Sequence, residues 1–406
     1  MVGGEPGGAA RTLLFTGKGG VGKTTLAAAT AARAAAEGHK TLILSTDPAH
    51  SLGDAFDVEL GAGATEVSAA LFVQQIDTQK RLQETWSEIQ RYLVDALGAA
   101  GLDALRAEEL TVIPGAEELL ALLEVRDQAC GGRWDLVVVD CAPTAETLRL
   151  LALPEALDWY LTKVFPMERR VVRALRPLLA PAVGLPSPRP EVWEAAERLQ
   201  AELLDVQRVL KAPRTTVRLV LTPESVVVAE ARRALTQLSL YGYRVDAVLA
   251  NRVFGPSNDS WRQGWAEAQQ ELLAEVADSF APLPIHVAPY ASAEPLGSSS
   301  LRDLGERVYG SDDPIAVREV AEPLSIVESG RGYLLSLPLP LADRDALELS
   351  RVGSDLVVTV SGRRRVLALP SVLRRCDVTG ARLSGGRLEV SFLPDEQLFP
   401  RNEAHP

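Results

Sequence analysis

The chain has 406 residues, 47% of them hydrophobic, and a formal net charge of -12 at pH 7. This length predicts two or three domains with a substantial core. The acidic balance argues against nucleic acid as a partner, because duplex binding needs a positively charged surface. No run of about 18 uncharged apolar residues is present, so we expect no stable insertion into a membrane.

The cysteines and the amino-terminal residues bear on the cellular compartment. Cys130, Cys141 and Cys376 form no C-x-x-C pair and leave an odd thiol, which is typical of a reducing environment. Residues 1–10 show neither the basic region nor the apolar core of a signal peptide. We therefore expect a cytoplasmic protein.

Strands and helices are predicted to alternate over the first three-quarters of the chain. Apolar runs predict strands at Leu13 to Thr16, Lys40 to Ser45, Leu71 to Ile76, Trp134 to Asp140, Thr216 to Leu221, Val245 to Ala250 and Pro284 to Ala288. Helical patterns lie between them, at Thr24 to Glu37, Ala116 to Ala129 and Val226 to Leu240. This order predicts an α/β fold with a doubly wound, mostly parallel sheet. Helical stretches at about 78–130 and 147–212 are expected to pack together as a subdomain.

The loop after the first strand matches the pattern G-x-x-x-x-G-K-[ST], with Gly17, Gly22, Lys23 and Thr24 at its fixed positions. In such a P-loop, backbone N–H groups and the positive end of the next helix hold phosphate. The lysine neutralises phosphate charge, and the threonine hydroxyl can bind Mg²⁺. We therefore expect a nucleoside triphosphate and Mg²⁺ as ligands. The loop residues predicted to contact them are Gly17, Lys18, Gly19, Gly20, Val21, Gly22, Lys23, Thr24 and Thr25.

Two further interpretations concern this loop. Gly17, Gly19 and Gly22 also fit the G-x-G-x-x-G pattern of dinucleotide-binding folds. The pair Lys23-Thr24 favours a triphosphate, because a nicotinamide site has no use for a cation and a metal-binding hydroxyl at the helix start. Lys18 marks the deviant form of the P-loop. Since Lys23 already serves the phosphates, Lys18 can reach outward, and a solvated lysine is the alternative.

Acidic residues at strand ends complete the expected site, because ligands of such sheets bind at the carboxyl ends of the strands. Asp140 ends a buried strand and is expected to hold Mg²⁺, directly or through water. Asp47 follows another strand and is the candidate for orienting or deprotonating the attacking water. An Asp-Pro turn that caps a helix is the alternative for Asp47. Asp47, Lys18 and Lys23 are the predicted catalytic residues.

Asn251 is the candidate for recognising the base. It follows a later strand, and an asparagine side chain can pair with the donor and acceptor edge of adenine, as it does in DNA recognition. No N-K-x-D motif for guanine is present. ATP is therefore the expected nucleotide.

Several motifs, in this order, resemble the arsenite-pump and guided-entry ATPases of the ArsA family. They are the loop Gly17 to Thr25, then Ser45 to His50, Pro114 to Glu118, and Asp140 to Thr144 running into Thr147 to Leu151. The resemblance covers about Arg11 to Tyr309, which gives an expected ATPase domain at residues 1–312.

The resemblance implies further roles. Asp47 would belong to switch I, and Asp140 to Thr144 would form switch II. Asn251 and Pro289 would flank adenine. Lys18 would reach the partner's phosphates in a face-to-face homodimer. The helical subdomain would form a groove that opens and closes with nucleotide around hydrophobic client protein segments.

The chain departs from the guided-entry members, which carry a zinc-binding C-x-x-C and a methionine-rich groove. It has no C-x-x-C and only Met1 and Met167, and Ala145-Glu146 stand where switch II usually has Gly-His. An arsenite-pump ATPase subunit is one alternative, although such pumps use clustered cysteines and usually two ATPase halves. A ParA/MinD-type positioning ATPase, which shares the deviant loop, is another.

The carboxyl-terminal part predicts a second module. Residues 313–332 read as a linker, 333–396 as a small β-sandwich and 397–406 as a tail. The expected strands are Tyr333 to Leu337, Ala346 to Leu349, Leu356 to Val360, Arg365 to Leu369 and Arg387 to Phe392. Leu337-Pro338, Leu369-Pro370 and the run from Ala381 to Val390 resemble the α-crystallin domain of small heat-shock proteins. Arg363, Arg364 and Arg365 read as a solvated turn.

Overall fold

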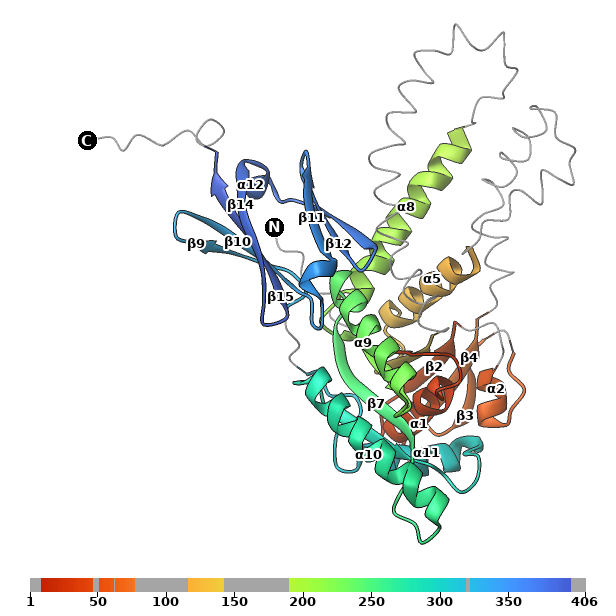
Figure 1. The fold of residues 1–406 in the computed structure, drawn as a ribbon. Helices are drawn as coiled ribbons and strands as arrows, with labels where there is room; N and C mark the ends of the chain where they lie inside the picture. The colour runs from red at the N-terminus through yellow and green to blue at the C-terminus, as the bar shows by residue number, and fades with distance from the viewer. Residues whose placement is uncertain are drawn as a thin grey trace, which may run out of the picture. The chain divides into compact units, whose positions relative to one another are not determined.

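The computed structural model describes residues 9–46, 51–61, 63–76, 116–141, 190–318 and 322–395 (Figure 1). Asp47, most of the predicted helical subdomain and the switch II residues after Cys141 lie outside these ranges. The described chain forms two compact units. The first contains Lys23 to Thr215 and Ala293 to Ile315, together with the chain up to Phe15. The second contains Thr16 to Gly22, Thr216 to Ser292 and the chain from Ala316.

The first unit is built on five strands in the spatial order β3-β4-β2-β5-β1. These are β1 (Arg11–Thr16), β2 (Thr41–Ser45), β3 (Thr65–Ser68), β4 (Leu71–Gln75) and β5 (Leu136–Asp140). Every residue of β1, β2 and β5 is buried, as expected of central parallel strands. The short β3, which we did not predict, pairs antiparallel with β4.

Helix α1 (Lys23–Ala36) packs closely against α11 (Gly297–Tyr309). A Cβ added at Gly305 would lie 2.5 Å from the Ala29 carbonyl oxygen, so glycine permits the two backbones to approach. The Thr30 and Tyr309 hydroxyls lie 2.7 Å apart in the same contact. Among the described residues of this unit, the other helices are α2 (Ser51–Phe56), α5 (Ala116–Cys130) and α8 (Pro190–Leu210). The small alanine side chains of α1 thus allow close packing against α11, and this packing holds the helix whose first turn carries Lys23 and Thr24.

Arg11 is an unexpected buried residue at the start of β1, only 1% exposed. Its Nη1 donates to the Arg214 carbonyl at 2.7 Å, and its Nε donates to the Ile315 carbonyl at 3.2 Å. Backbone acceptors therefore satisfy the guanidinium, which removes the penalty of burying an unpaired donor.

The second unit contains three parallel strands and two long helices. The strands are β6 (Thr215–Leu221), β7 (Val245–Val253) and β8 (Ile285–Pro289), and the helices are α9 (Ser225–Leu240) and α10 (Ser260–Phe280). Strand β7 extends three residues beyond the predicted end, Ala250, and therefore includes Asn251. The predicted combination of a mostly parallel sheet with helices is confirmed.

A β-sandwich forms the carboxyl-terminal part of the second unit. One sheet has the order β14-β15-β10-β9 and the other β11-β12-β13. The strands are β9 (Ser325–Ser329), β10 (Gly332–Pro338), β11 (Leu347–Val352), β12 (Asp355–Val360), β13 (Arg363–Ala368), β14 (Cys376–Ser384) and β15 (Arg387–Pro394), with the short helices η2 (Arg344–Ala346) and α12 (Ser371–Arg374). Buried Leu335, Leu356 and Phe392 share one core between the sheets. The predicted sandwich is confirmed.

Two expectations for this region are wrong in detail. Strand β9 lies inside 313–332, the segment predicted to be a linker, and pairs antiparallel with β10. The three arginines at 363–365 belong to strand β13 and do not form a solvated turn. Arg365 is 7% exposed and donates to the Leu240 carbonyl at the end of α9. Leu240 itself joins the sandwich core, so apolar packing and a hydrogen bond attach the sandwich to α9.

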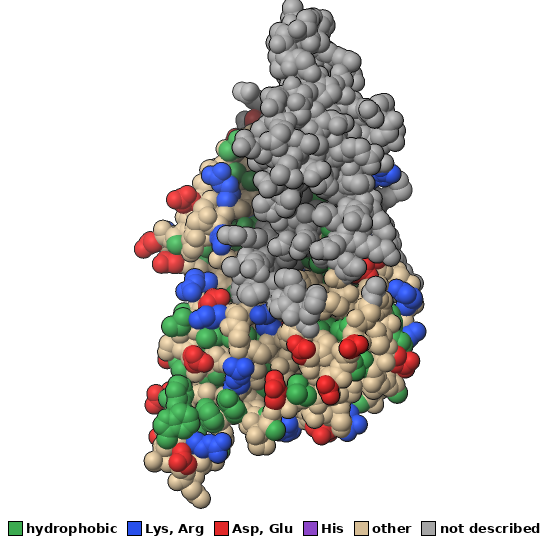
Figure 2. All heavy atoms as spheres, turned by 90° about the vertical axis from the view of Figure 1, so that its right-hand side faces the viewer, with side chains coloured by type: hydrophobic (Ala, Val, Ile, Leu, Met, Phe, Trp, Pro, Cys, Tyr) green, Lys and Arg blue, Asp and Glu red, His purple; other side chains and the backbone are tan. Residues whose placement is uncertain are grey.

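Two surface properties bear on partners. Figure 2 shows Lys and Arg side chains interspersed with Asp and Glu over the described part of one face. Within the ranges that the structure describes, no helix combines the length and apolar character needed to cross a bilayer.

Candidate active site

The P-loop runs from the end of β1 into the first turn of α1. A Cβ at Gly17 would overlap the Val220 carbonyl oxygen of β6, so only glycine allows this approach. Gly20 has φ +79°, a conformation that glycine adopts readily. No described atom lies within 4 Å of a Cβ built at Gly19 or Gly20. The loop is therefore open to its surroundings at these two glycines.

Asn251 of β7 holds the second half of the loop. Its side chain is 8% exposed, and its Nδ2 donates to the Val21 carbonyl at 2.8 Å. Its Oδ1 accepts from the Arg252 backbone N–H at 2.9 Å, so both bonds agree on the orientation of the carboxamide. A Cβ at Gly22 would overlap Nδ2, so Gly22 leaves the room in which Asn251 lies.

This bond orients one particular donor of the loop. In a trans peptide, the carbonyl and the following N–H point in opposite directions. Fixing the Val21 carbonyl on Asn251 therefore turns the Gly22 N–H away from Asn251. The contact suits an anion nest, in which successive N–H groups must face the ligand.

Thr24 and Asp140 meet in the first unit. Thr24 Oγ1 donates to Asp140 Oδ2 at 2.6 Å, and the Ser51 hydroxyl lies 3.3 Å from Thr24 Oγ1. Asp140 ends β5, where it pairs in register with Phe15 of β1 and Ser45 of β2. The ends of three neighbouring strands thus converge at this carboxylate. Two hydroxyls and a carboxylate are the hard oxygen donors that Mg²⁺ binds, so the residues fit this ion.

Lys23 and Cys141 lie beside this cluster. Lys23 is 7% exposed although it carries an ammonium group. Burial and the neighbouring Asp140 carboxylate raise the pKa of the Cys141 thiol well above its ordinary value, and the Lys23 charge opposes this only in part. Cys141 therefore remains a protonated thiol at neutral pH. Lys18 is half-buried in the loop.

The structure brings the predicted residues together in two sets. Lys23, Thr24 and Asp140 form one set in the first unit. In the second unit, Gly17 to Gly22 contact Asn251, and Pro289 of β8 pairs with Val253 of β7. The peptide bond between Gly22 and Lys23 joins the two sets in the chain. Asp47 lies outside the described residues, and its role stays a prediction.

Sequence reasoning missed two supporting residues. Ser51 was overlooked, although it follows the Asp47 motif closely in the chain. Gln269 of α10 accepts from the Phe254 N–H at 2.8 Å and donates to the Arg252 carbonyl at 3.1 Å. It fixes the chain just after Asn251, where Arg252 has φ +58°. A contact between residues this far apart in sequence leaves no local signal.

A buried strand, a glycine loop, a Lys-Thr pair at a helix start and an acid ending a neighbouring parallel strand together define a P-loop nucleoside triphosphatase. Residues 10–310 match the family model described as anion-transporting ATPase, and residues 330–392 match the HSP20-like domain found in ArsA. The chain belongs to the ArsA family of ATPases.

Relatives support this assignment over nearly the whole chain. The chain is 35% identical to a putative arsenical pump-driving ATPase of Chlorobaculum tepidum, over 95% of this chain and 97% of that protein. It is 37% identical to a protein of the same description from Prosthecochloris vibrioformis, with the same coverage. It is 28% identical to the ATPase GET3B of Arabidopsis thaliana, over 73% of this chain and 78% of that protein. The chain is accordingly an ATPase that binds nucleotide.

Proposed function

We propose that this ATPase is a Mg²⁺-dependent homodimer whose ATP cycle binds and releases hydrophobic segments of client proteins. Lys23 and the loop N–H groups hold the phosphates, and Lys18 reaches the nucleotide of the partner subunit. Asp47 accepts the proton of the attacking water. Asn251 and Pro289 lie beside adenine.

Thr24 and Asp140 are the residues that would hold Mg²⁺, with Ser51 next to them. The ion supplies charge neutralisation between the phosphate oxygens when it is bound. The short bond from Thr24 to Asp140 keeps both oxygen donors in place before the ion arrives. Preorganised donors need less rearrangement during the reaction.

One observation carries the client-binding part of the proposal. The HSP20-like sandwich is attached to α9, the helix that precedes the strand whose Asn251 binds the P-loop. Arg365 and Thr236 connect the sandwich with α9, the latter through a 2.7 Å bond to the Pro340 carbonyl. The next element, β7, carries Asn251, which binds Val21 of the loop. A change of loop conformation on hydrolysis therefore has a continuous path to the sandwich.

An arsenical pump-driving ATPase is the second candidate, and the names of two relatives favour it. Binding of arsenite by such a protein needs thiolates that lie close together. Cys141 is buried with a raised pKa, whereas Cys130 at the end of α5 is exposed, and its pKa is raised mainly by desolvation. These two thiols make a poor arsenite site at neutral pH.

The proposal is tested with the full chain, ATP, Mg²⁺ and a synthetic 20-residue Leu/Ala peptide. We expect Asp47→Asn to bind ATP and to lower kcat by about 100-fold or more. With ATP, this variant should retain the peptide and sediment as a dimer, and the wild type should release the peptide after hydrolysis. Equal turnover of the two proteins would remove Asp47 from the chemistry. Absence of peptide binding in every nucleotide state would refute the client cycle.

The same assay separates the second candidate. Arsenite should leave the ATPase rate unchanged, and Cys130→Ser with Cys141→Ser should behave as the wild type does. Stimulation by arsenite that the double substitution abolishes would establish the pump-driving alternative in place of the client cycle.

A further inference from the structure

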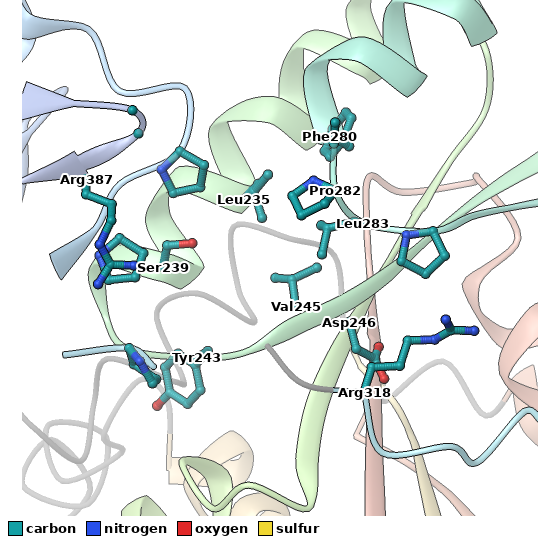
Figure 3. A pocket seen from close by; sticks show the side chains of 17 residues that line it. Leu235, Ser239, Tyr243, Val245, Asp246, Phe280, Pro282, Leu283, Arg318 and Arg387 are labelled. Atoms are coloured by element: carbon teal, nitrogen blue, oxygen red, sulfur yellow. The ribbon is translucent and has the colours of Figure 1, made fainter. Parts of the chain in front are cut away.

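A cavity of about 640 Å³ lies within the second unit (Figure 3). Its wall combines side chains of α9, the start of β7, the turn that follows α10, and the β-sandwich. Leu235, Val245, Phe280 and Leu283 supply apolar surface around it. A volume of this size is within the range of small-molecule sites.

The wall is apolar and stiff. Leu235, Val245 and Phe280 are themselves buried, at 5%, 4% and 1% exposure, so packing holds them in position. Five prolines also line the cavity: Pro282, Pro284, Pro323, Pro338 and Pro340. Proline has a fixed φ and no N–H, so these five residues offer no backbone hydrogen-bond donor. This part of the wall suits the apolar body of a ligand, and a preformed wall lowers the entropy cost of binding it.

Arg387 adds a positive charge at one side of the cavity. It is half-buried, and its Nε donates at 2.8 Å to the hydroxyl of Ser336, which is 7% exposed. Arg382, on the neighbouring strand, pairs with Glu389 at 2.5 Å. Within the described parts of the chain, Arg387 has no such carboxylate partner. A guanidinium held in this way is suited to bind an anion in two-pronged geometry.

The other charged residues do not cancel this charge. Figure 3 shows Arg318 and Asp246 on the side of the cavity away from Arg387. Asp246 accepts from the Thr216 hydroxyl at 2.7 Å and from Arg218 Nε at 3.4 Å, and both residues of that ion pair are buried. Because Asp246 lies on the far side of the cavity and is paired with Arg218, it does not offset the charge of Arg387.

We propose that this cavity binds an anionic amphiphile, a long-chain carboxylate whose apolar body lies among the prolines, Leu235 and Phe280 and whose carboxylate pairs with Arg387. The half-buried guanidinium of Arg387 suits one carboxylate, and a volume of about 640 Å³ suits a small molecule. Such a ligand would contact α9 and the sandwich at once. It would therefore stabilise the attachment of the HSP20-like domain, independently of nucleotide.

The test is isothermal titration calorimetry of the full chain with dodecanoate, below its critical micelle concentration and without nucleotide. Dodecyltrimethylammonium, which has the same tail and the opposite charge, is the ligand control. We expect Arg387→Gln to weaken dodecanoate binding about 10-fold or more, because a charge-assisted pair is lost. Arg387→Lys should retain part of the affinity. Arg382→Gln is the matched control and should bind as the wild type does.

A second variant tests the position of the tail. Ser239 of α9 lines the cavity, and Ser239→Trp should fill it and remove dodecanoate binding. Circular dichroism melting identifies folded variants. The proposal is overturned if the wild type does not bind dodecanoate, or if folded Arg387→Gln binds it unchanged. Equal binding of the cationic amphiphile, or tighter binding of an apolar hexapeptide with a free carboxyl end, would also overturn it. None of these outcomes depends on ATP turnover.

Discussion

The Thr24 hydroxyl and the Asp140 carboxylate lie 2.6 Å apart, although 116 positions separate the two residues in the chain. The bond connects the first turn of α1 with the end of β5. It places two oxygen ligands for a hard cation side by side. Substitutions here should therefore affect metal-dependent catalysis more than folding.

We expect Asp140→Asn to lower kcat by about 100-fold and to raise the Mg²⁺ concentration needed for half-maximal rate. The neutral amide keeps the shape of the side chain but loses the charge that attracts the ion. Steady-state ATPase assays over a Mg²⁺ series measure both effects. Thr24→Ser, which keeps the hydroxyl, is the control and should retain most activity, whereas Thr24→Ala should not. A normal Mg²⁺ dependence in Asp140→Asn would exclude the carboxylate from metal binding.

The loop and the acid were predictable because each is a local signal. Gly17, Gly22, Lys23 and Thr24 have fixed spacing, and Asp140 directly follows four apolar residues. The alternation of strands and helices similarly predicts the mostly parallel sheet. These features depend on residues that are close together in the sequence, and sequence patterns predict such local features well.

The contacts that support the site were not predictable in the same way. Asn251 lies 230 positions from Val21, so nothing near either residue indicates their hydrogen bond. Arg365 looked like part of a solvated turn because three arginines stand in a row. Strand alternation places Arg363 and Arg365 on the face opposite to exposed Arg364. Of the three, only Arg365 is buried, and it donates to the Leu240 carbonyl 125 positions away. Tertiary packing, which single-sequence patterns do not contain, decides both cases.

The contact between Asn251 and the P-loop makes a prediction about base selectivity. If Asn251 acts by holding the Val21 carbonyl, Asn251→Ala should weaken ATP and ITP binding by the same factor, about 10-fold for one lost hydrogen bond. If it reads adenine, only ATP should weaken, because ITP carries an oxygen where ATP carries an amino group. Fluorescence titration with both nucleotides distinguishes the two roles. Gln269→Ala, which loosens the chain after Asn251, should weaken both nucleotides to a smaller extent.

Gly22 and Asn251 should also show strong coupling. Gly22→Ala alone places a methyl group on the Asn251 amide and should abolish nucleotide binding. Adding Asn251→Ala removes the overlapping atom and should restore part of the affinity. The remaining loss reflects two terms: the missing bond from Asn251 to Val21, and φ +89° at position 22, which costs an alanine about 1 kcal/mol. A double-mutant cycle measures this coupling, and simple additivity of the two losses would show that the steric account is wrong.

The attachment of the sandwich predicts that substitutions of two neighbouring arginines, Arg365 and Arg364, change the stability of the protein by different amounts. Arg365→Ala removes a buried side chain and leaves the Leu240 carbonyl without this donor, which should lower the free energy of unfolding of the second unit by about 1 to 3 kcal/mol. Arg364→Ala, at an exposed position of the same strand, should change it by less than about 0.5 kcal/mol. Urea denaturation monitored by tryptophan fluorescence measures both. Equal effects would show that Arg365 does not hold the sandwich.

The three cysteines should differ in reactivity. With iodoacetamide at pH 8, the folded chain should gain one label at exposed Cys130, and buried Cys141 and Cys376 should react only after unfolding. Desolvation raises the pKa of Cys130 above the ordinary thiol value of 9.0, so its thiolate fraction and its rate should be lower than those of a model thiol and should rise with pH.

The raised pKa of Cys141 also predicts how stability depends on pH. Below pH 9.0, the ordinary thiol value, the folded and unfolded forms are both protonated, so this group places no penalty on folding. At higher pH the unfolded thiol ionises while the folded one does not, so the free energy of unfolding should fall. Cys141→Ala should show a weaker fall above pH 9.0, whereas Cys130→Ala is the surface control. Rapid labelling of Cys141 in the folded chain would contradict its burial, and it would restore a paired thiol site for arsenite.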